Sequence, residues 1–273
     1  MTEREGKMAN ITGKTKKSRI SKLLSDHGPA LIALAALVAI WQFVCSVGLV
    51  PPFMLPSPVA VVKAFIKDFG LLMGHAGVTL QEAFYGLVIG TVLGFLFAVF
   101  MDAFDIIRRA VYPILVVTQT IPTVSIAPLL VLWFGYEMKP KIILIVLATF
   151  FPITVGLLGG FASVDKDSVA LLKSMGAGKW KIFRYIKFPS ALPQFFSGLK
   201  IAAAYAIVSA VISEWLGGFN GLGVYMTRVK KAYAFDKMFA VIILISVVSL
   251  LLMLVVNVAE KKCMPYRNFD KRE

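Results

Sequence analysis

The stretch Ser163–Lys187 reads SVDKDSVALLKSMGAGKWKIFRYIK and lies between two long apolar runs of the chain. Apolar residues recur in its first half at helical spacing, and Gly176 then ends the run as a glycine at a helix C-terminus does. A second short helix is predicted after this glycine, with apolar residues along one face and four basic residues beside them, and it ends at Pro189. The stretch therefore predicts two short amphipathic helices joined by a glycine turn.

Six apolar segments are long enough to cross a membrane, because a bilayer core of about 30 Å needs about 20 residues in helix. They are approximately Pro29–Val50, Val78–Phe100, Val111–Phe134, Lys141–Ala162, Phe195–Gly217 and Met238–Val258. The chain is 58% hydrophobic, which is more than soluble domains usually contain. The predicted fold class is an all-α polytopic membrane protein with about six transmembrane helices and a two-helix loop.

An even number of spans puts both termini on one side of the membrane. Of the 29 lysines and arginines, 20 lie in the four stretches that share this side, and eight lie in the loops of the opposite side. Because cytoplasmic loops carry the excess of Lys and Arg, both termini and the two-helix loop are predicted to be cytoplasmic. The predicted organisation is a basic N-terminal tail at 1–28, a transmembrane domain at 29–258 with its loop at 163–194, and a basic C-terminal tail at 259–273.

The net charge of +14 is explained mainly by this topology, with some attraction to anionic membrane lipid. The basic residues are spread over several loops and not gathered on one soluble face, so a nucleic-acid partner is not expected.

The loop resembles the cytoplasmic coupling loop of permease subunits in binding-protein-dependent ABC importers. That family has an EAA sequence, a glycine six residues after its Glu, and I-x-L-P ten residues after the glycine. Here Gly176, Ile186 and Pro189 stand at the matching places, whereas Ala170, Leu171 and Leu172 replace the EAA. Three further lines support the likeness, which is nearest to the nitrate, sulfonate, taurine and thiamine-precursor branch. They are LPSP at Leu55–Pro58, IPTVSIAPLLVLWFG at Ile121–Gly135 and GLG at Gly221–Gly223.

The resemblance implies a transmembrane permease subunit of an ATP-driven importer in the bacterial inner membrane. Such a subunit moves a small polar solute inward by alternating access when partner ATPases, which carry ATP and Mg²⁺, close. It also implies an extracytoplasmic solute-binding protein at the outer loops Pro51–Phe69 and Phe219–Lys237, and a second permease copy or a paralogue. The residues that would contact the ATPase are Ser168, Leu171, Leu172, Met175, Gly176, Ala177 and Gly178. The residues that would anchor the loop are Ile186, Pro189 and Pro193.

The third span contains prolines and small polar side chains. Since proline removes a backbone donor, Pro122 and Pro128 are expected to break or kink this helix. Small polar groups beside such a break suit the wall of a solute pathway, although they also suit a kinked helix whose hydroxyls bond their own backbone. The candidate pathway residues are Gln119, Thr120, Thr123, Ser209, Ser213 and Glu214.

Glu214 lies at the outer end of the fifth span. An acid at the centre of a bilayer is costly, so Glu214 is expected to face protein, water or the interface. It is either a gate residue near the outer mouth or an interfacial acid paired with a basic residue such as Arg228. Glu82, near the outer end of the second span, is expected at the interface.

Gly86, Gly90 and Gly94 lie on one face of the second span, which lets a neighbouring backbone approach closely. This face serves either packing within the chain or homodimerisation.

Motifs for enzymatic chemistry are absent from the sequence. It contains no GxxxxGK[ST], GxSxG or HExxH, and its two cysteines and two histidines have no metal-ligand spacing. The chain is therefore not expected to be an enzyme or to hold a metal or cofactor itself. The alternative function is an ion-gradient-driven secondary transporter, which usually has paired acids or unwound glycine-rich segments at mid-membrane.

Overall fold

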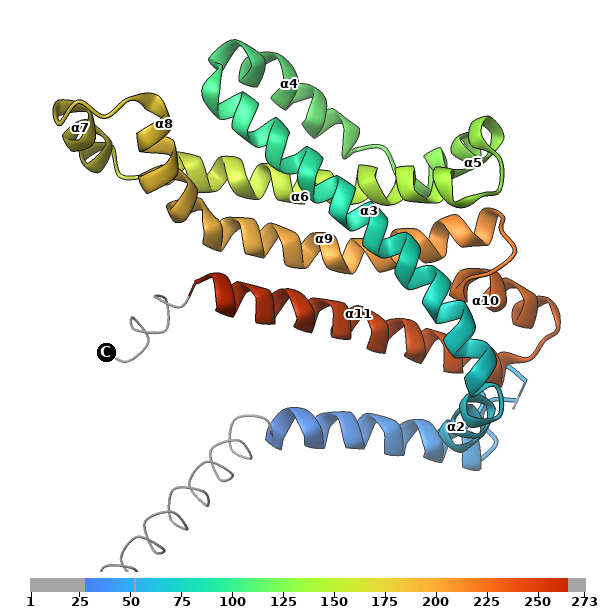
Figure 1. Ribbon diagram of the computed structural model, residues 1–273. Helices are drawn as coiled ribbons and strands as arrows, with labels where there is room; N and C mark the ends of the chain where they lie inside the picture. Colours follow the sequence, from blue (N-terminus) through green and yellow to red (C-terminus); the bar gives the residue numbers. More distant parts are fainter. Residues whose placement is uncertain (1–27, 52, 265–273) are drawn as a thin grey trace, which may run out of the picture. The chain divides into compact units, whose positions relative to one another are not determined.

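The computed structural model describes residues 28–51 and 53–264. Its helices are Gly28–Ser46, α2 (Pro58–Lys67), α3 (Phe69–Ala103), α4 (Asp105–Thr118), α5 (Thr123–Phe134), α6 (Met138–Ala162), α7 (Lys166–Ser174), α8 (Lys179–Ile182), the π-turn η1 (Phe183–Lys187), α9 (Phe188–Leu216), α10 (Leu222–Lys231) and α11 (Phe235–Cys263) (Figure 1). Within the described residues, five helices are long and apolar enough to cross a membrane, or six if the bent pair α4–α5 is one span. The predicted all-α polytopic class is confirmed. The predicted basic tails extend outside the described residues, to 1–27 and 265–273.

The described residues divide into two compact units, with the boundary between Ala64 and Phe65. In the first unit, the segment after Gly28–Ser46 folds back on this helix. The indole Nε1 of Trp41 donates a hydrogen bond to the Pro56 carbonyl at 3.1 Å, and the Cys45 thiol donates to the Leu55 carbonyl at 3.6 Å. The first predicted span is therefore helical as far as Ser46, and Gly48 in the left-handed region follows it.

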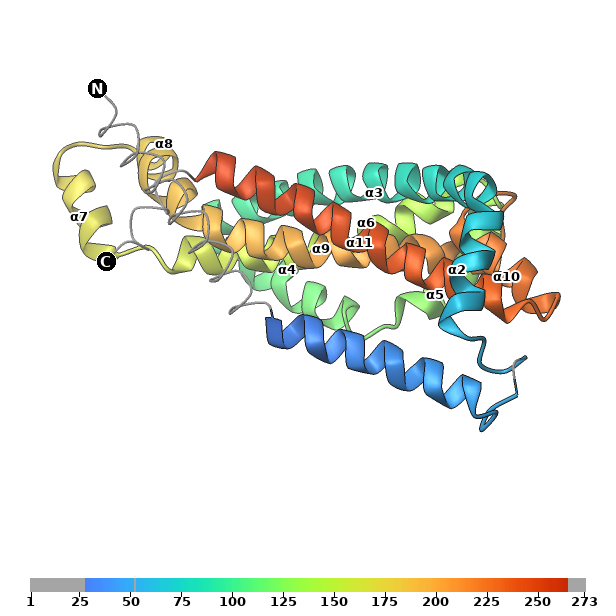
Figure 2. The ribbon, with the colours of Figure 1, turned by 90° about the horizontal axis from the view of Figure 1, so that it is seen from below.

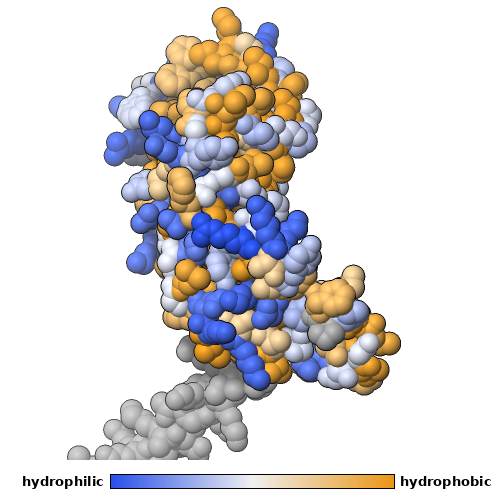
Figure 3. Space-filling model, turned by 90° about the vertical axis from the view of Figure 1, so that its right-hand side faces the viewer, coloured by the Kyte–Doolittle hydropathy of each residue, from blue (hydrophilic) through white to orange (hydrophobic). Residues whose placement is uncertain are grey.

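In the second unit, α6 and α9 lie side by side at the centre of a helical bundle. α3 crosses both helices, and α11 packs along α9 (Figures 1 and 2). α7 and α8 lie at the end of the bundle where α3 ends and α9 begins, whereas α10 lies at the opposite end. Seen from the side on which α10 lies, the surface carries a patch of hydrophilic side chains among hydrophobic ones (Figure 3).

Glycines bring α3 into close contact with α6. A Cβ atom at Gly86 would overlap Ile145, one at Gly90 would overlap Thr149, and one at Gly94 would lie 2.8 Å from the Phe150 carbonyl oxygen. The Thr154 hydroxyl donates to the carbonyl of Gly94 at 3.3 Å across the same contact. The glycine face thus packs within the chain, against α6, because only glycine leaves room for the second helix.

The third predicted span is broken. α4 ends at Thr118 and α5 begins at Thr123, and the two helices are bent by 95°. Pro122 lies in extended backbone immediately before α5, where a proline is well tolerated because the first N–H groups of a helix have no partner within it. The break is therefore at Gln119–Pro122, and Pro128 is accommodated inside α5.

The second helix of the predicted loop does not end at Pro189. Lys179–Leu216 is one continuous 38-residue helix that includes α8, η1 and α9, so the fifth predicted span begins well before Phe195. The reason is the π-turn, in which the Phe188 N–H donates to the Phe183 carbonyl five residues earlier. Pro189 directly follows this turn, inside the continuous helix, and its ring is accommodated there.

Candidate functional site

α7 begins with a side-chain cap. The Asp165 carboxylate accepts hydrogen bonds from the N–H groups of Asp167 at 3.2 Å and Ser168 at 3.0 Å, and from the Ser168 hydroxyl at 2.7 Å. These bonds, first among them the one from the Ser168 hydroxyl, hold the pKa of the Asp165 carboxyl below its usual range. The N-terminal donors of α7 are therefore satisfied from within its own segment.

α7 ends in a Schellman motif. The Gly176 N–H donates to the Lys173 carbonyl at 3.0 Å, and the Ala177 N–H donates to the Leu172 carbonyl at 2.9 Å. Gly176 has φ +80°, a backbone region that glycine adopts without steric cost. Gly176 thus ends the helix as the sequence predicted.

This short, doubly capped helix has large apolar side chains in solvent. Leu171 is 64% exposed and Met175 is 73% exposed, whereas Val169 and Leu172 are half-buried. Gly178 is exposed and Ser168 and Ala177 are half-buried. Exposed apolar side chains on a rigid helix that lies at one end of the bundle suit contact with another protein.

The helix that follows α7 is fastened to the bundle. The Lys187 ammonium group in η1 donates to both carboxylate oxygens of Asp102, at the end of α3, at 2.8 Å. Phe183 stacks on Trp180 and also contacts Phe161 of α6, with ring centroids 5.8 and 5.6 Å apart. The predicted anchor residues Ile186, Pro189 and Pro193 are half-buried along the same continuous helix.

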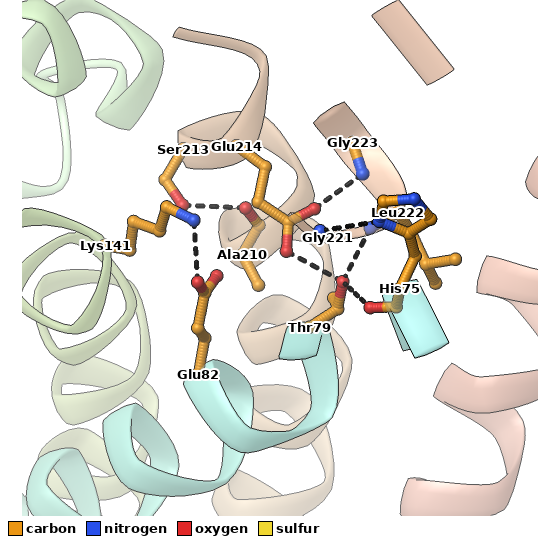
Figure 4. A network of polar contacts seen from close by, with 10 residues as sticks. All are labelled: His75, Thr79, Glu82, Lys141, Ala210, Ser213, Glu214, Gly221, Leu222 and Gly223. Atoms are coloured by element: carbon orange, nitrogen blue, oxygen red, sulfur yellow. Dashed lines mark hydrogen bonds and ion pairs between the residues drawn. The ribbon is translucent and has the colours of Figure 1, made fainter. Parts of the chain in front are cut away.

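A buried polar network lies at the opposite end of the bundle, where α3, α6, α9 and α10 meet (Figure 4). Its centre is Glu214 of α9, which is 1% exposed. The Glu214 carboxylate accepts hydrogen bonds from the Thr79 hydroxyl at 2.7 Å and from the Gly223 N–H at 2.5 Å. The Thr79 oxygen in turn accepts from the Leu222 N–H at 2.9 Å. One carboxylate of α9 thus joins α3 to the first turn of α10.

The beginning of α10 requires glycine. A Cβ atom at Gly221 or Gly223 would collide with the Glu214 side chain, and Gly221 has φ +126°. The Gly221 N–H donates to His75 Nδ1 at 3.0 Å. The first N–H groups of a helix have no partner within it, and here His75, Thr79 and Glu214 supply the acceptors. The GLG sequence at Gly221–Gly223 therefore supplies the backbone N–H donors of this network.

A buried ion pair adjoins the network. The Lys141 ammonium group of α6 lies 2.7 Å from Glu82 Oε1 of α3, and these residues are 4% and 1% exposed. The expectation that Glu82 lies at the interface is wrong, because its charge is compensated by Lys141 inside the bundle. The pairing of Glu214 with Arg228 is also wrong, since Arg228 donates to the Phe219 carbonyl at 2.7 Å.

A second polar contact holds the outer face of α10. Asp68, just before α3, accepts a hydrogen bond from the Tyr225 hydroxyl at 2.6 Å and lies 2.7 Å from the Lys237 ammonium group. The bond from Lys237, followed by that from Tyr225, lowers the pKa of Asp68. Burial, followed by the bond to Asp68, raises the pKa of Tyr225.

The structure separates the predicted pathway residues into two groups. Gln119 and Thr120 are exposed at the break of the third span, and Thr123 is half-buried at the start of α5. Ser209, Ser213 and Glu214 are buried between helices at the α10 end, and the Ser213 hydroxyl donates to the Ala210 carbonyl of its own helix. The first group therefore lies at the surface of the described chain, and the second lies among packed side chains.

Sequence reasoning missed His75, Thr79 and Lys141. A signal for the first two existed, because His75, Thr79 and Glu82 recur at positions i, i+4 and i+7 and continue the glycine stripe of the same helix face. Polar groups on one face of an apolar span indicate a polar partner helix. Among the described residues, no group of three or more His, Cys, Asp or Glu is placed to hold a metal ion.

Comparison with known proteins gives consistent results. The family model for the inner membrane component of binding-protein-dependent transport systems matches residues 90–264. A probable ABC transporter permease protein of Haemophilus influenzae is 37% identical over 81% of this chain and 91% of its own. The formylaminopyrimidine transport permease protein of Halalkalibacterium halodurans is 37% identical over 88% of this chain and 95% of its own. A solved amino acid ABC transporter with histidines superposes with a TM-score of 0.61, at 17% identity, over 73% of this chain and 97% of that one.

Proposed function

Since the chain belongs to the family of inner membrane components of binding-protein-dependent transport systems, and so is the transmembrane permease subunit of an ABC importer, we propose that α7 is the helix by which a partner ATPase moves it. Family membership favours the importer over the ion-gradient-driven alternative. The observation that carries the proposal is the exposure of Leu171 and Met175 on a helix that is capped at both ends.

On the permease, the surface that contacts the ATPase is formed by residues 168–178. Leu171 and Met175 supply the apolar area, and desolvated apolar anchors contribute most of the affinity at interfaces. The caps keep α7 helical before a partner binds, so little ordering entropy is lost on binding. The family's EAA acid is replaced here, so contact through apolar side chains takes the place of contact through a Glu.

Movement of α7 passes to the spans through two connections. On one side, α7 follows the end of α6 after a short turn, and on the other, Ala177 and Gly178 lead into the continuous helix Lys179–Leu216. The Lys187–Asp102 pair adds a link from this helix to α3. A rigid-body shift of α7 is therefore delivered to three packed helices, which is how a small displacement is converted into a change between inward-facing and outward-facing states.

Other parts of the importer are supplied by partner proteins. ATP and Mg²⁺ bind to the ATPase, because this sequence has no phosphate-binding loop. A solute-binding protein docks on the outer loops Pro51–Phe69 and Phe219–Lys237, and a second permease copy completes the pathway. Both termini and α7 are cytoplasmic, as the excess of Lys and Arg on that side supports. Gln119, Thr120 and Thr123 border the pathway, and Ser209, Ser213 and Glu214 belong to its outer gate.

The test is co-purification of the ATPase with the permease. Leu171→Asp or Met175→Asp puts a charge into the contact, and the recovered ATPase is expected to fall at least about tenfold, which corresponds to 1.4 kcal/mol. Phe219→Asp is the matched control, because Phe219 is equally exposed at the α10 end, away from α7. Undiminished recovery with both α7 variants would exclude the docking role. Labelling of Met175→Cys by an impermeant maleimide in intact cells would place α7 outside and contradict the orientation.

A further inference from the structure

An open groove is lined by Gln119, at the break in the third span, and by residues of the neighbouring helices α6 and α9. Its volume is about 430 Å³, which falls in the range of roughly 300–1,000 Å³ found for small-molecule sites. Apart from Gln119, all its lining residues belong to α6 and α9. The groove is separate from the buried network around Glu214 and from α7, because it shares no lining residue with either.

The groove has its shape because two glycines form part of its lining. A Cβ atom at Gly156 would lie 2.8 Å from the Gln194 carbonyl oxygen, and one at Gly198 would lie 2.5 Å from the Pro152 carbonyl oxygen. α6 and α9 therefore touch backbone to backbone at this level, without side chains between them. Both glycines line the groove, together with larger side chains that include Phe151, Ile201 and Tyr205.

The lining contains no charged side chain among the described residues. Its polar groups are the carboxamides of Gln119 and Gln194 and the hydroxyls of Ser197 and Tyr205. Its aromatic faces come from Phe151 and Tyr205. An anion that entered would lose its hydration without meeting a cation, which is strongly unfavourable at membrane depth.

Gln194 is the polar group that requires explanation. Its Oε1 atom is buried and has no hydrogen-bond partner among the described residues. The neighbouring Ser197 hydroxyl donates to the Pro193 carbonyl of its own helix at 2.9 Å, so it offers only its lone pairs. A buried amide oxygen without a partner is uncommon, and its ordinary explanations are strain, a functional role, or a water or ion bound there.

We propose that this groove is a solute subsite for a planar, uncharged heterocycle of the aminopyrimidine class. A carboxamide presents a donor and an acceptor side by side, and this edge matches a ring nitrogen with an adjacent amino group, as Asn and Gln do with adenine. Phe151 and Tyr205 supply aromatic surface for the ring. The proposal rests on the importer function, and a relative with 37% identity is named for formylaminopyrimidine transport.

The experiment uses the permease assembled with its ATPase and binding protein in proteoliposomes. Uptake of radiolabelled formylaminopyrimidine is compared with uptake of radiolabelled ethanesulfonate, a small organic anion. Gln194→Leu keeps the side-chain bulk but removes the amide, and pyrimidine uptake is expected to fall at least about tenfold. Gln81→Leu makes the same change at an exposed position of α3 outside the groove, and uptake is expected to stay within about twofold of the unmodified chain.

A second measurement does not depend on Gln194. Ser197→Cys, in a chain with Cys45 and Cys263 replaced by serine, is labelled with a maleimide with and without formylaminopyrimidine at about 10 mM, above the usual KM range. Labelling is expected to slow at least about threefold with the pyrimidine and to stay unchanged with ethanesulfonate.

The outcomes separate the subsite from the importer function. Uptake of the sulfonate but not the pyrimidine, uptake of neither, pyrimidine uptake that Gln194→Leu leaves intact, or labelling that the pyrimidine does not slow overturns the subsite. Any of these results with the ATPase still co-purifying leaves the importer function standing. Loss of ATPase co-purification from the unmodified chain overturns the proposed function itself.

Discussion

The buried pair Lys141–Glu82 provides a stringent test of the bundle's interior. Lys141→Met replaces the ammonium group with an apolar side chain of similar length. Glu82 then remains buried, without the cation that compensates it and with the network of Glu214 beside it. Glu82→Met has the converse effect and leaves the buried Lys141 ammonium group without an anion to compensate its charge. The double variant removes both charges and leaves two apolar side chains.

The magnitudes follow from burial. Both residues are less than one-twentieth exposed, so solvent screens them little, and removal of one partner from such a pair costs about 3–5 kcal/mol. Replacement of both partners by apolar residues of similar volume is often neutral, so the double variant is expected within about 1 kcal/mol of the unmodified chain. A loss of 3–5 kcal/mol lowers the folded-to-unfolded ratio by between about a hundredfold and several thousandfold.

The assay is unfolding of the detergent-solubilised protein by added dodecyl sulfate, followed by tryptophan fluorescence. Lys139→Met is the matched control, because Lys139 is exposed two residues earlier on α6, and a change below about 0.5 kcal/mol is expected. A loss below about 1 kcal/mol for Lys141→Met, or a double variant whose loss equals the sum of the two single losses, would refute the account of a coupled buried pair.

Three further predictions follow from local geometry. Gly94→Ala puts a methyl group 2.8 Å from the Phe150 carbonyl oxygen and is expected to lower the free energy of unfolding by about 1–3 kcal/mol in the same assay. The control Gly77→Ala, whose methyl group would have no atom within 4 Å, should cause no loss. Equal losses for the two variants would contradict the close α3–α6 contact. Gly176→Val forces a β-branched residue to φ +80°, so amide protection in α7 measured by hydrogen exchange should fall about 5- to 30-fold, and Gly178→Val, at φ −71°, should leave it intact. The pKa of Asp68 is lowered by folding, so its stabilising contribution is full above the ordinary Asp value of about 3.9 and is lost as the pH falls through the lower folded-state pKa. The stability gap between the unmodified chain and Asp68→Asn should therefore be constant from pH 7 to about 5 and should close only below about pH 4; a gap that closes near neutrality would exclude this role.

The sequence predicted the elements that depend on local patterns. Five of the six predicted apolar segments fall in membrane-length helices of the described chain, because about 20 apolar residues have no stable alternative in a bilayer. Gly176 ended α7 because its conformation is a property of glycine and of the preceding turn. The position of the break in the third span followed from Pro122 in the same way.

The contacts that were not predicted join residues that are far apart in the sequence. The pair Lys141–Glu82 joins residues 59 positions apart, and the bond from Gly221 to His75 joins residues 146 positions apart. A single sequence shows that Glu82 and Glu214 need partners, but not which helix supplies them. The continuity of α8 with α9 was missed for a different reason, because Pro189 ends an ordinary helix and is accommodated here by the π-turn before it.

The direction in which α8 points depends on the number of residues in the π-turn Phe183–Lys187. A turn closed by a bond over five residues contains one residue more than the α-helix allows. Each residue of an α-helix turns the chain by about 100° and advances it by about 1.5 Å. Deletion of a single residue from this turn would therefore swing Trp180, and the point where α7 is attached, by more than a quarter of a revolution around the axis of the fifth span. The direction in which this subunit presents α7 is thus encoded by a count of residues as much as by their identity.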